Sequence, residues 1–549
     1  MVLPLITVDS WDEVFEQRGR YQLEPILPAF IAARRWFRSK ARAIRCIAID
    51  DAIRIGGAEA CVLVLRIEYA DGACDNYLLP LTVAKHSGSD ELLAEAATPD
   101  GARRVIGGAL ANPQFRDALL NAIRCEEKFE GKAGEMVASR TKAYREECGD
   151  ADLRIESFVS RAEQSNTSII YRDRYILKLF RKVEPGVNPD IEIGRFLTGR
   201  GFKHTPAVLG TLEYRLLDRA QRPPDGLCAQ GGDAAVGYAA GILQEFVPNQ
   251  GDAWKYTLEA LSGFFARALA QGEQAPEVKR HPLELMKQEM PVETRELLEA
   301  YADSARLLGK RTAEMHAALA DENGGPDFAP ERFAQEDAEK LYEEMLGQAD
   351  ITFELLKRKQ GAMEGSAAES AQELLQMEDR VRERFSALRA GGMDAVRMRS
   401  HGDYHLGQVL WTGKDFMIID FEGEPARPLA DRRAKTLAMR DVAGMIRSFQ
   451  YAAFAALFGQ VSGVPVEPES MSAVEGWAAY WTAWVSAAYL HGYFEEAGTC
   501  SFVPADAEQR RILFDAFLLQ KALYEVAYEL NNRPDWARIP LRGILSLMN

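Results

Sequence analysis

The chain has 549 residues, of which 47% are hydrophobic and 27% are charged, and its formal net charge is -16. This composition excludes a fibrous or intrinsically disordered chain, and the length allows about three or four domains. The acidic balance disfavours binding to nucleic acid or to an anionic membrane surface. Seven widely spaced cysteines without a C-x-x-C pair argue against a disulfide framework or a zinc site and favour reduced thiols. We expect a cytoplasmic protein, because the N-terminus does not resemble a signal peptide and no stretch of about 20 apolar residues could span a membrane.

The first half of the chain is predicted to mix strands with a few helices. A helix is expected at residues 26–36, where apolar residues recur at near-helical spacing, and residues 96–150 are expected to be mostly helical. A further helix is expected at 191–198, since Asn188-Pro189-Asp190 carries residues that favour a helix start. Apolar runs bounded by turn residues predict strands at 61–67, 77–83, 155–159, 168–171, 175–180 and 241–247.

Helices are predicted to dominate after Pro248. Residues 340–390 are rich in Lys, Glu and Gln, which predicts a solvated helical hairpin with a kinked loop at 361–366. Short strands are expected to return at 409–411 and 417–421, and helices follow to the end of the chain.

The segments HGDYHLGQ (401–408) and MIIDFE (417–422) carry a pattern typical of phosphoryl transfer. Asp403 would accept a proton from the acceptor hydroxyl or orient that hydroxyl. Gln408, five residues later, and Asp420, at the end of an apolar strand, would supply the hard oxygen ligands that Mg²⁺ prefers. Protein kinases place Asp, Asn and Asp in this order with the same five-residue step. The alternative is that both aspartates have only structural roles, one in a loop and one at a strand end.

A second group of candidates lies upstream and would bind the nucleotide. Lys178 lies inside the apolar strand YILKLF, where an ammonium is costly unless it meets an anion such as an ATP phosphate. Glu192, on the following helix, would hold Lys178 in place. Lys178 could instead be an edge-strand lysine that reaches solvent. Backbone N–H groups of a small polar turn would line the phosphates, and the turn residues are Ser165, Asn166, Thr167 and Ser168.

Two further segments complete the expected site. Gln244, Glu245 and Val247 fall where a kinase hinge offers backbone groups to adenine; an ordinary strand end is the alternative. Lys521, Tyr524 and Tyr528 share one helix face, which suits a sugar acceptor but also suits a buried aromatic stripe.

Other acceptor candidates are weaker, for the same reason of helical spacing. They are Trp484, Tyr489 and His491. His405 is expected to brace the catalytic loop, and it is also a candidate acceptor contact.

Around these residues the chain resembles the bacterial maltokinases, including the maltokinase domains fused to trehalose synthases. The resemblance spans nearly the whole chain and is weakest around 350–390. It is carried by the blocks EQSNTS (163–168), ILKLFR (176–181), EPGVNP (184–189), IIDFEGEPARPL (418–429), MRDVAGMIRSF (439–449), WVSAAYLHGY (484–493) and KALYEVAYELNNRPDWARIPLRGI (521–544).

The resemblance implies that ATP phosphorylates maltose at its anomeric hydroxyl to give maltose 1-phosphate, which feeds α-glucan synthesis. It implies Asp403 as catalytic base, Gln408 and Asp420 as magnesium ligands and Lys178 as a phosphate ligand, with Glu422 as a possible extra carboxylate near the metals. We therefore expect an α+β, bilobal protein-kinase-like fold. Its parts would be an N-terminal cap (1–95), a nucleotide-binding small lobe (96–247) and a mostly helical large lobe with the acceptor site (248–549).

Two alternatives stay open at this point. A related small-molecule kinase, acting on glucosamine or an aminoglycoside, would have the same catalytic residues and a different acceptor pocket. A non-catalytic partner module of trehalose synthase is disfavoured by the intact set of catalytic residues.

Overall fold

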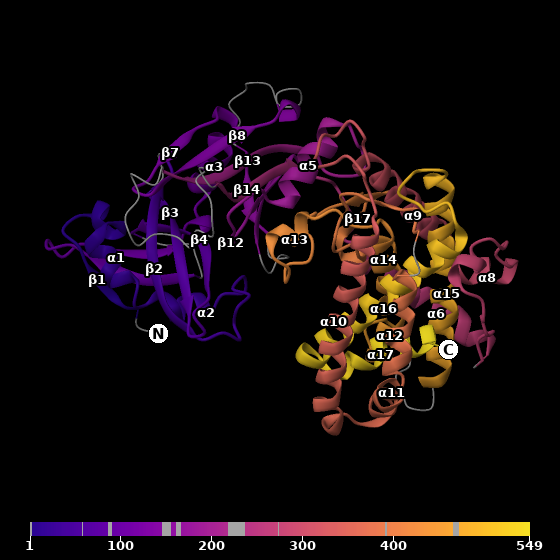
Figure 1. The fold of residues 1–549 in the computed structure, drawn as a ribbon. Helices are drawn as coiled ribbons and strands as arrows, with labels where there is room; N and C mark the ends of the chain where they lie inside the picture. Colours follow the sequence, from indigo (N-terminus) through magenta and orange to yellow (C-terminus); the bar gives the residue numbers. More distant parts are fainter. Residues whose placement is uncertain are drawn as a thin grey trace. The chain divides into compact units, whose positions relative to one another are not determined.

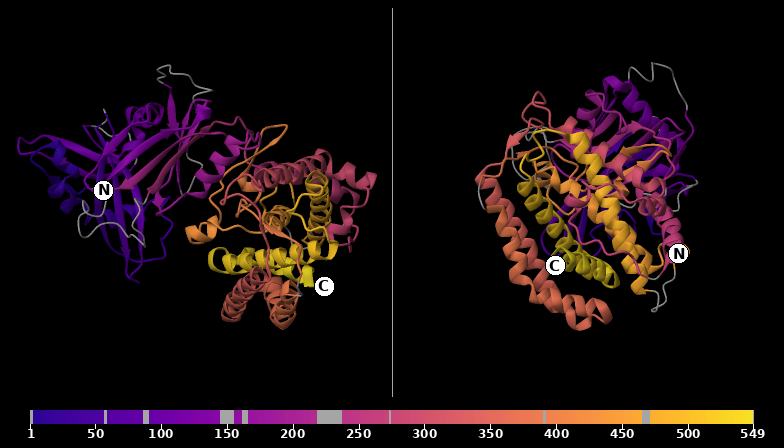
Figure 2. Two further views of the ribbon diagram at one scale, coloured as in Figure 1. Left: turned by 45° about the horizontal axis from the view of Figure 1, so that its top comes forward. Right: turned by 90° about the vertical axis from the view of Figure 1, so that its right-hand side faces the viewer.

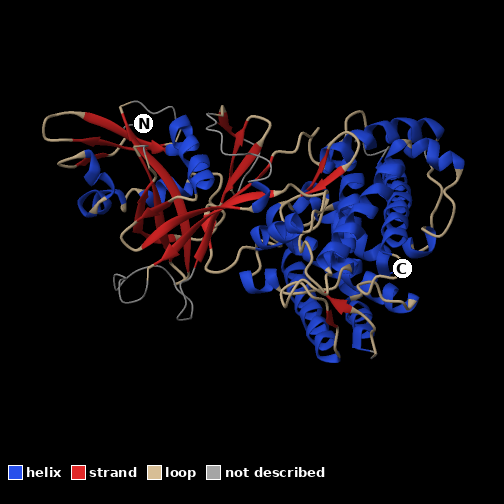
Figure 3. Ribbon diagram, turned by 90° about the horizontal axis from the view of Figure 1, so that it is seen from above, coloured by secondary structure: helices blue, strands red, loops and turns tan. Residues whose placement is uncertain are grey.

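The computed structural model describes residues 3–56, 59–85, 91–144, 155–160, 166–217, 237–272, 274–389, 392–464 and 471–548. The chain forms two compact units. Unit 1 comprises residues 1–201 and 206–248, and unit 2 comprises residues 202–205 and 249–549. Unit 1 is rich in strands and unit 2 in helices (Figures 1 and 3).

The first sheet of unit 1 has the order β1-β5-β6-β4-β3-β2, and β12 pairs with β4. Its strands are β1 (Leu5–Thr7), β2 (Ile44–Arg54), β3 (Ala60–Tyr69), β4 (Cys74–Ala84), β5 (Leu92–Ala97), β6 (Arg103–Gly108) and β12 (Lys182–Val183). Strand β3 is apolar on both faces because each face is covered. Leu63 and Leu65 belong to a core that also contains side chains of α1 (Gln17–Leu23) and α2 (Leu27–Ala32), whereas Val62 and Val64 face a second core.

The second sheet of unit 1 has the order β7-β8-β13-β14-β11-β10-β9. Its strands are β7 (Lys128–Glu130), β8 (Gly134–Arg140), β9 (Ser157–Val159), β10 (Thr167–Tyr171), β11 (Tyr175–Leu179), β13 (Val208–Leu216) and β14 (Gly237–Glu245). It shares the second core with the first sheet and with α3 (Pro113–Cys125). Helix α5 (Pro189–Gly199) follows, and the side chain of Asn188 caps it by accepting from the backbone N–H groups of Asp190 and Ile191.

Residues 96–150 differ from the expected mostly helical segment. They contain only one long described helix, α3, and the strands β6, β7 and β8. Strand β8 forms because it pairs residue by residue with β13, 70 to 82 positions later in the chain, and such a distant partner leaves little mark on local periodicity. The boundary expected at residue 95 falls inside β5, and the first sheet continues to Gly108.

Unit 2 consists mainly of helices, together with two short two-stranded sheets. The helices are α6 (Ala253–Gln271), α7 (Pro282–Leu285), α8 (Val292–Leu298), α9 (Ala300–Leu319), α10 (Gln335–Lys359), α11 (Gly365–Gln376), α12 (Glu378–Ser386), α13 (Leu429–Arg433), α14 (Met439–Phe454), α15 (Met471–Ala497), α16 (Ala507–Asn532) and α17 (Arg538–Met548). Helices α9 and α15 pack tightly together, and a Cβ at Gly309 would collide with the main chain of Tyr489. The expected helical hairpin is confirmed, since α10 runs back through α11 and α12 and packs against α16 (Figure 2).

The two short sheets of unit 2 are β15 (Glu331–Arg332) with β16 (Val396–Arg397), and β17 (Val409–Trp411) with β18 (Phe416–Ile418). The strand predicted at 409–411 is confirmed. The next strand, predicted at 417–421, begins one residue earlier and ends at Ile418. Residues 202–205 join this unit through a hydrogen bond from Ile418 N to His204 O of 2.8 Å. The β17–β18 hairpin carries the predicted catalytic segment at its ends.

Cysteine chemistry differs from expectation at one position. Cys46, Cys61, Cys125 and Cys500 are free thiols, but Cys74 is disulfide-bonded, so reduced thiols do not account for every described cysteine. Among the described residues, none of the helices has the length and apolar character needed to cross a membrane.

Candidate active site

The position of Asp403, in the loop that precedes β17, is fixed by contacts of the two residues before it, His401 and Gly402. His401 is 1% exposed, and its ring Nε2 lies 2.9 Å from the carbonyl oxygen of Ile419. Gly402 has a φ of +84° and approaches Gly423 closely, a conformation that glycine adopts without a side-chain clash. The loop is therefore tied to the end of the β17–β18 hairpin, one residue before Asp420.

Asp441, at the start of α14, anchors the same loop through hydrogen bonds. It was not among the candidates identified from the sequence. Its buried carboxylate accepts from His401 N at 2.7 Å and from Gly402 N at 3.0 Å. The His316 ring on α9 also lies within hydrogen-bond distance of it, 3.2 Å from Nε2 to Oδ2, and the other ring nitrogen lies 2.9 Å from the hydroxyl of Tyr493. An aspartate inside the apolar helix block MRDVAGMIRSF was the available signal, because a buried carboxylate requires donors.

The electrostatics of the loop favour an ionised Asp403. Burial alone would raise the pKa of its carboxyl, but the nearby ammonium of Lys521, with smaller contributions from the two neighbouring histidines, outweighs burial, and the pKa lies below its usual value. Lys521 Nζ is 3.4 Å from Oδ1, and His405 Nε2 is 3.9 Å from Oδ2. The same pairing with Asp403 raises the pKa of Lys521 despite its burial. An anionic carboxylate can accept a proton from a hydroxyl, which is the role of a general base.

His405 is placed as a bracing residue. Its Nδ1 accepts a hydrogen bond of 3.1 Å from Gly407 N and so caps the short 3-10 helix η6 (Leu406–Gln408). Burial lowers the pKa of its imidazole more than Asp403 raises it. A neutral ring with one nitrogen occupied in this way holds the loop that carries Gln408.

The predicted metal ligands of unit 2 are brought together by the hairpin. Ile419 N donates to Gln408 O at 3.0 Å, so Gln408 lies beside the residue that precedes Asp420. Asp420 has a φ of +67°, a left-handed conformation that costs free energy for a non-glycine residue and that recurs at functional sites. Carboxylate oxygens of Asp420 and Glu422 lie within 4.8 Å of each other. These are hard oxygen donors, and they fit a magnesium ion.

A pocket of about 550 Å³ opens beside Asp403 and is lined by the predicted acceptor residues His405, Lys521, Tyr524 and Tyr528. On α16 the rings of Tyr524 and Tyr528 stack at 6.4 Å between centroids, and Lys521 Nζ lies 5.1 Å from the Tyr524 ring centroid. Sequence reasoning missed other lining residues, of which some come from distant segments and others lie on α16 or directly after it. These are Trp254, Glu424, Tyr451, Glu525, Glu529, Arg533 and Trp536.

The three weaker sequence candidates for the acceptor site lie on another helix, α15. Trp484 is 7% exposed and Tyr489 is fully buried, with its hydroxyl 3.2 Å from Thr312 Oγ1. His491 is exposed, and its ring Nδ1 lies 3.1 Å from the carbonyl oxygen of Met286. None of the three lines the pocket beside Asp403; Trp484 and Tyr489 pack in the core of unit 2, and a contact of any of the three with the acceptor stays a prediction.

In unit 1, Lys178 lies on β11 with a side chain that is 11% exposed. Its Nζ is 3.4 Å from Oδ2 of Asp190, which is almost fully buried in the first turn of α5. The structure thus gives Lys178 a carboxylate two positions before the predicted Glu192, which belongs to the same first turn. The role expected for Glu192 stays a prediction.

The turn expected to line phosphates is described from Asn166 onward, and Ser165 lies outside the described residues. Thr167 and Ser168 begin β10 and pair with Leu179 and Lys178 of β11, which brings this segment beside the predicted phosphate lysine. At the expected hinge, Gln244 pairs with Ile176.

The rest of the expected hinge continues from β14 toward the end of unit 1. Glu245 N donates to Ala207 O at 3.0 Å, and Phe246 N donates to Arg174 O at 2.8 Å. Val247 follows directly, ahead of Pro248, where unit 1 ends. Contacts of these residues with adenine stay predictions.

Comparison with known proteins finds two matching family models and several similar proteins. Residues 30–111 match the maltokinase N-terminal cap domain, and residues 155–423 match the phosphotransferase enzyme family. A glucosamine kinase of Mycolicibacterium smegmatis is 22% identical over 395 residues, 70% of this chain and 78% of that protein. A glucosamine kinase of Streptacidiphilus jiangxiensis is 25% identical over 458 residues, 79% of this chain and 85% of that protein. A solved glucosamine kinase in complex with glucosamine, ADP and inorganic phosphate has a TM-score of 0.58 at 19% identity and covers 95% of this chain and 99% of its own.

These matches define the class of protein first. The chain is a phosphotransferase with a kinase-like α+β fold, and its activity is that of an ATP-dependent sugar kinase. The match at residues 30–111 is more particular, since the maltokinase N-terminal cap domain covers strands β2 to β6 of the first sheet. In carrying both matches, the chain is similar to the cap-bearing, maltokinase-type phosphotransferases.

Proposed function

We propose that the chain transfers the γ-phosphoryl group of ATP to the anomeric hydroxyl of maltose, giving maltose 1-phosphate and ADP. The observation that carries this proposal is the pocket of about 550 Å³ that joins Asp403 to the aromatic face of α16. Its volume lies within the range of about 300–1,000 Å³ that small-molecule sites occupy. Such a pocket suits a disaccharide, with one ring beside Asp403 and the second ring farther along the aromatic wall.

The distal part of the pocket offers the contacts that a second hexose ring needs. Tyr528 is 46% exposed, so its ring is accessible for stacking against the apolar face of a sugar. Glu529 is held by Arg533 at 2.6 Å, and Glu525 by the buried Arg447 at 2.5 Å. These fixed carboxylates can accept hydrogen bonds from sugar hydroxyls, and hydrogen bonds of this charged kind are the stronger ones.

In the proposed reaction the anomeric oxygen attacks the γ-phosphorus while the bond to the β–γ bridging oxygen breaks, and ADP leaves. The hydroxyl proton passes to the carboxylate of Asp403, which releases it to solvent afterwards. Lys521 keeps Asp403 ionised before the transfer and stabilises the negative charge near the acceptor oxygen. Such charge stabilisation and positioning dominate phosphoryl transfer.

Magnesium is the cofactor of this proposal. Gln408 and Asp420 would hold it, and Glu422 would add a further carboxylate. Bound Mg²⁺ supplies positive charge to the phosphate oxygens. In unit 1, Lys178, oriented by Asp190, would bind phosphates, the segment from Asn166 to Ser168 would line them, and Gln244 to Val247 would offer backbone groups to adenine. Unit 1 is then the nucleotide-binding part with its cap, and unit 2 supplies the base and the acceptor pocket.

Glucosamine is the second candidate acceptor, and a specific observation favours it. Two relatives are glucosamine kinases, and three glutamates, Glu424, Glu525 and Glu529, line the pocket, where a cationic amine would be attracted. Each of these carboxylates already contacts arginine. Glu424 contacts Arg427 and Arg440, Glu525 contacts Arg447, and Glu529 contacts Arg533. This pairing weakens the preference for a cation and leaves maltose as the first choice.

The proposed reaction also has a cellular setting. Because ATP is the phosphoryl donor, we place the reaction in the cytoplasm. A trehalose synthase would supply maltose, and maltose 1-phosphate would feed α-glucan (glycogen) synthesis. A physical complex with trehalose synthase would appear as co-elution of the two purified proteins in gel filtration.

An acceptor panel tests the proposal. The protein is incubated with ATP and Mg²⁺ and with maltose, trehalose, glucosamine or an aminoglycoside, and ADP release is measured by a coupled assay. We expect kcat/KM to be highest with maltose. A preference for glucosamine over maltose would overturn the acceptor assignment, and no turnover with any acceptor would favour a non-catalytic partner of trehalose synthase.

A further inference from the structure

Arg181 is a buried arginine at the point where the chain passes from one sheet of unit 1 to the other. Just before it, Phe180 N donates to Ala240 O of the second sheet at 3.0 Å, and the carbonyl of Arg181 itself accepts from Leu78 N of the first sheet at 2.8 Å. The next residues, Lys182 and Val183, form β12 and pair with β4 of the cap. The main chain at Phe180 and Arg181 is therefore hydrogen-bonded to both sheets.

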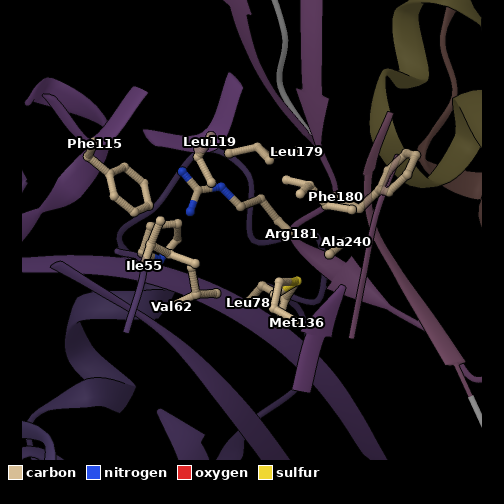
Figure 4. Close-up of a pocket in the computed structure, with 12 residues that line it drawn as sticks. Ile55, Val62, Leu78, Phe115, Leu119, Met136, Leu179, Phe180, Arg181 and Ala240 are labelled. Carbon is tan, nitrogen blue, oxygen red and sulfur yellow. The ribbon is translucent and has the colours of Figure 1, made fainter. Parts of the chain in front are cut away.

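The side chain of Arg181 is 4% exposed and enters an almost entirely apolar cavity of about 20 Å³ (Figure 4). It is the only charged residue among those that line the cavity, all of which belong to the described part of the chain. They are Ile55, Val62, Leu78, Pro80, Phe115, Leu119, Met136, Leu179, Phe180, Arg181, Leu212 and Ala240. Burial lowers the pKa of the guanidinium to about 10, an effect that Glu91 partly offsets. A cation in such a place is costly, and apolar residues of similar size often replace one without loss of stability. Its presence therefore calls for a reason other than packing.

Two contacts of Arg181 supply that reason. Nε donates a hydrogen bond of 2.9 Å to Oγ1 of Thr167, at the start of β10 and next to the segment proposed to line phosphates. On the cap side, the guanidinium carbon lies 5.0 Å from the centroid of the Trp36 ring, and Trp36 is itself 6% exposed. One buried side chain therefore bridges an aromatic residue of the cap and the first residue of the strand that pairs with Lys178.

We propose that Arg181 is a positioning residue for the nucleotide site, through which the cap holds the segment Asn166 to Ser168 in its phosphate-binding conformation. This inference rests on the proposed function, because it takes that segment as the place where phosphates bind. Arg181 does not touch the nucleotide. It acts through Thr167, and its effect appears in the affinity for ATP and ADP rather than in the chemistry at Asp403.

Four variants test the inference. Arg181→Lys keeps the charge and loses the Nε donor. Arg181→Met removes the charge and fills similar space. Thr167→Val removes the acceptor and leaves the backbone N–H in place, and the double variant Thr167→Val/Arg181→Lys closes a cycle. The matched control is Arg116→Lys, because Arg116 is also a buried arginine of unit 1, and its bonds go to Leu110 O and to Ser157 instead of to the segment at 166–168.

The measured quantities are KM for ATP, KM for the acceptor, kcat, and Kd for ADP with Mg²⁺ by calorimetry. We expect Arg181→Met and Thr167→Val each to raise KM for ATP and Kd for ADP about tenfold, the ratio that loss of one hydrogen bond to a charged group produces. KM for the acceptor and kcat should stay within about twofold of the wild-type values. The double variant Thr167→Val/Arg181→Lys should bind ADP no more weakly than whichever of Thr167→Val and Arg181→Lys binds it more weakly. Arg116→Lys should leave nucleotide affinity unchanged.

A purely structural role predicts another result. The melting temperature of the Arg181 variants would then fall while KM for ATP and Kd for ADP stayed at the wild-type values, and this result overturns the inference alone. Absence of ADP binding by the wild-type protein would overturn the proposed function, and the inference with it. Should Arg181→Met fail to fold, Thr167→Val carries the test, because it leaves the buried guanidinium in place.

Discussion

Replacing Asp441 by asparagine should separate the support of the catalytic loop from the chemistry of Asp403. The carboxylate receives the backbone N–H groups of His401 and Gly402 on different oxygens, and the His316 ring contacts the same oxygen as His401. An asparagine has one amide oxygen, so at least one buried donor loses its acceptor, at a cost of about 1–3 kcal/mol. The bonds that remain lose their charged acceptor, which removes roughly 1 kcal/mol from each. We expect unfolding free energy to fall by about 3–5 kcal/mol, a large part of the typical 5–15 kcal/mol.

Activity should fall with stability, because the loop is held through this carboxylate. A displacement of Asp403 by about 1 Å is enough to lower turnover on the order of 100-fold. The assay combines calorimetric melting with kcat at a temperature well below the transition. The matched control is Asp415→Asn, since Asp415 pairs with Arg311 at 2.8 Å in the same unit and does not contact the catalytic loop. Wild-type kcat in Asp441→Asn at that temperature would refute the reasoning.

The stability loss should also depend on pH. Burial would raise the pKa of Asp441, but its hydrogen bond with His316 and the nearby histidines prevail, and the folded-state pKa is depressed. A depressed pKa contributes stability that is complete above the unfolded-state value of about 3.9 and is lost as the pH falls through the folded value. The difference in stability between wild type and Asp441→Asn should therefore narrow in strongly acidic buffer.

Three further predictions concern the site residues. Lys521→Met should move the acid limb of the kcat/KM profile to higher pH, because burial would then raise the pKa of Asp403 without the offsetting ammonium; an unmoved limb in a pH titration would contradict this. Asp420→Asn should raise the Mg²⁺ concentration needed for half-maximal activity at least tenfold, measured by magnesium titration, whereas an unchanged requirement would exclude Asp420 as a ligand. Tyr528→Ala should raise KM for maltose about tenfold with little change in kcat, while Tyr21→Ala, at an exposed tyrosine of unit 1, should change neither; equal effects of the two variants would contradict the stacking role.

Local sequence carried most of the information about the catalytic loop. The strand at 409–411 was predicted with its observed bounds, because an apolar run between turn residues admits few alternatives. The residues 401–408 and 417–422 are close in sequence, so their spacing translates into the hairpin that places Gln408 beside Ile419, the residue before Asp420. The sequence also contained the Lys178 signal, since a lysine in an apolar strand needs an anion.

Tertiary arrangement decided what the sequence did not reveal. Lys178 contacts Asp190, in the first turn of α5 that begins after the Asn188 cap, whereas the partner predicted from the sequence was Glu192 in the same turn. Strand β8 was missed because its pairing with β13 is distant. The acceptor pocket was only half foreseen for the same reason, since α16 contributes residues at helical spacing while Trp254 and Tyr451 arrive from other helices.

The most direct test of the account joins the product to the proposed base. Purified protein is incubated with ATP, Mg²⁺ and maltose, and the product is examined by phosphorus and proton NMR for wild type and for Asp403→Asn. The account predicts a phosphate coupled to the anomeric proton of maltose, and a fall in kcat of about 100- to 10,000-fold in the variant with nucleotide binding retained. A phosphate at another position, or wild-type turnover by Asp403→Asn, would contradict it.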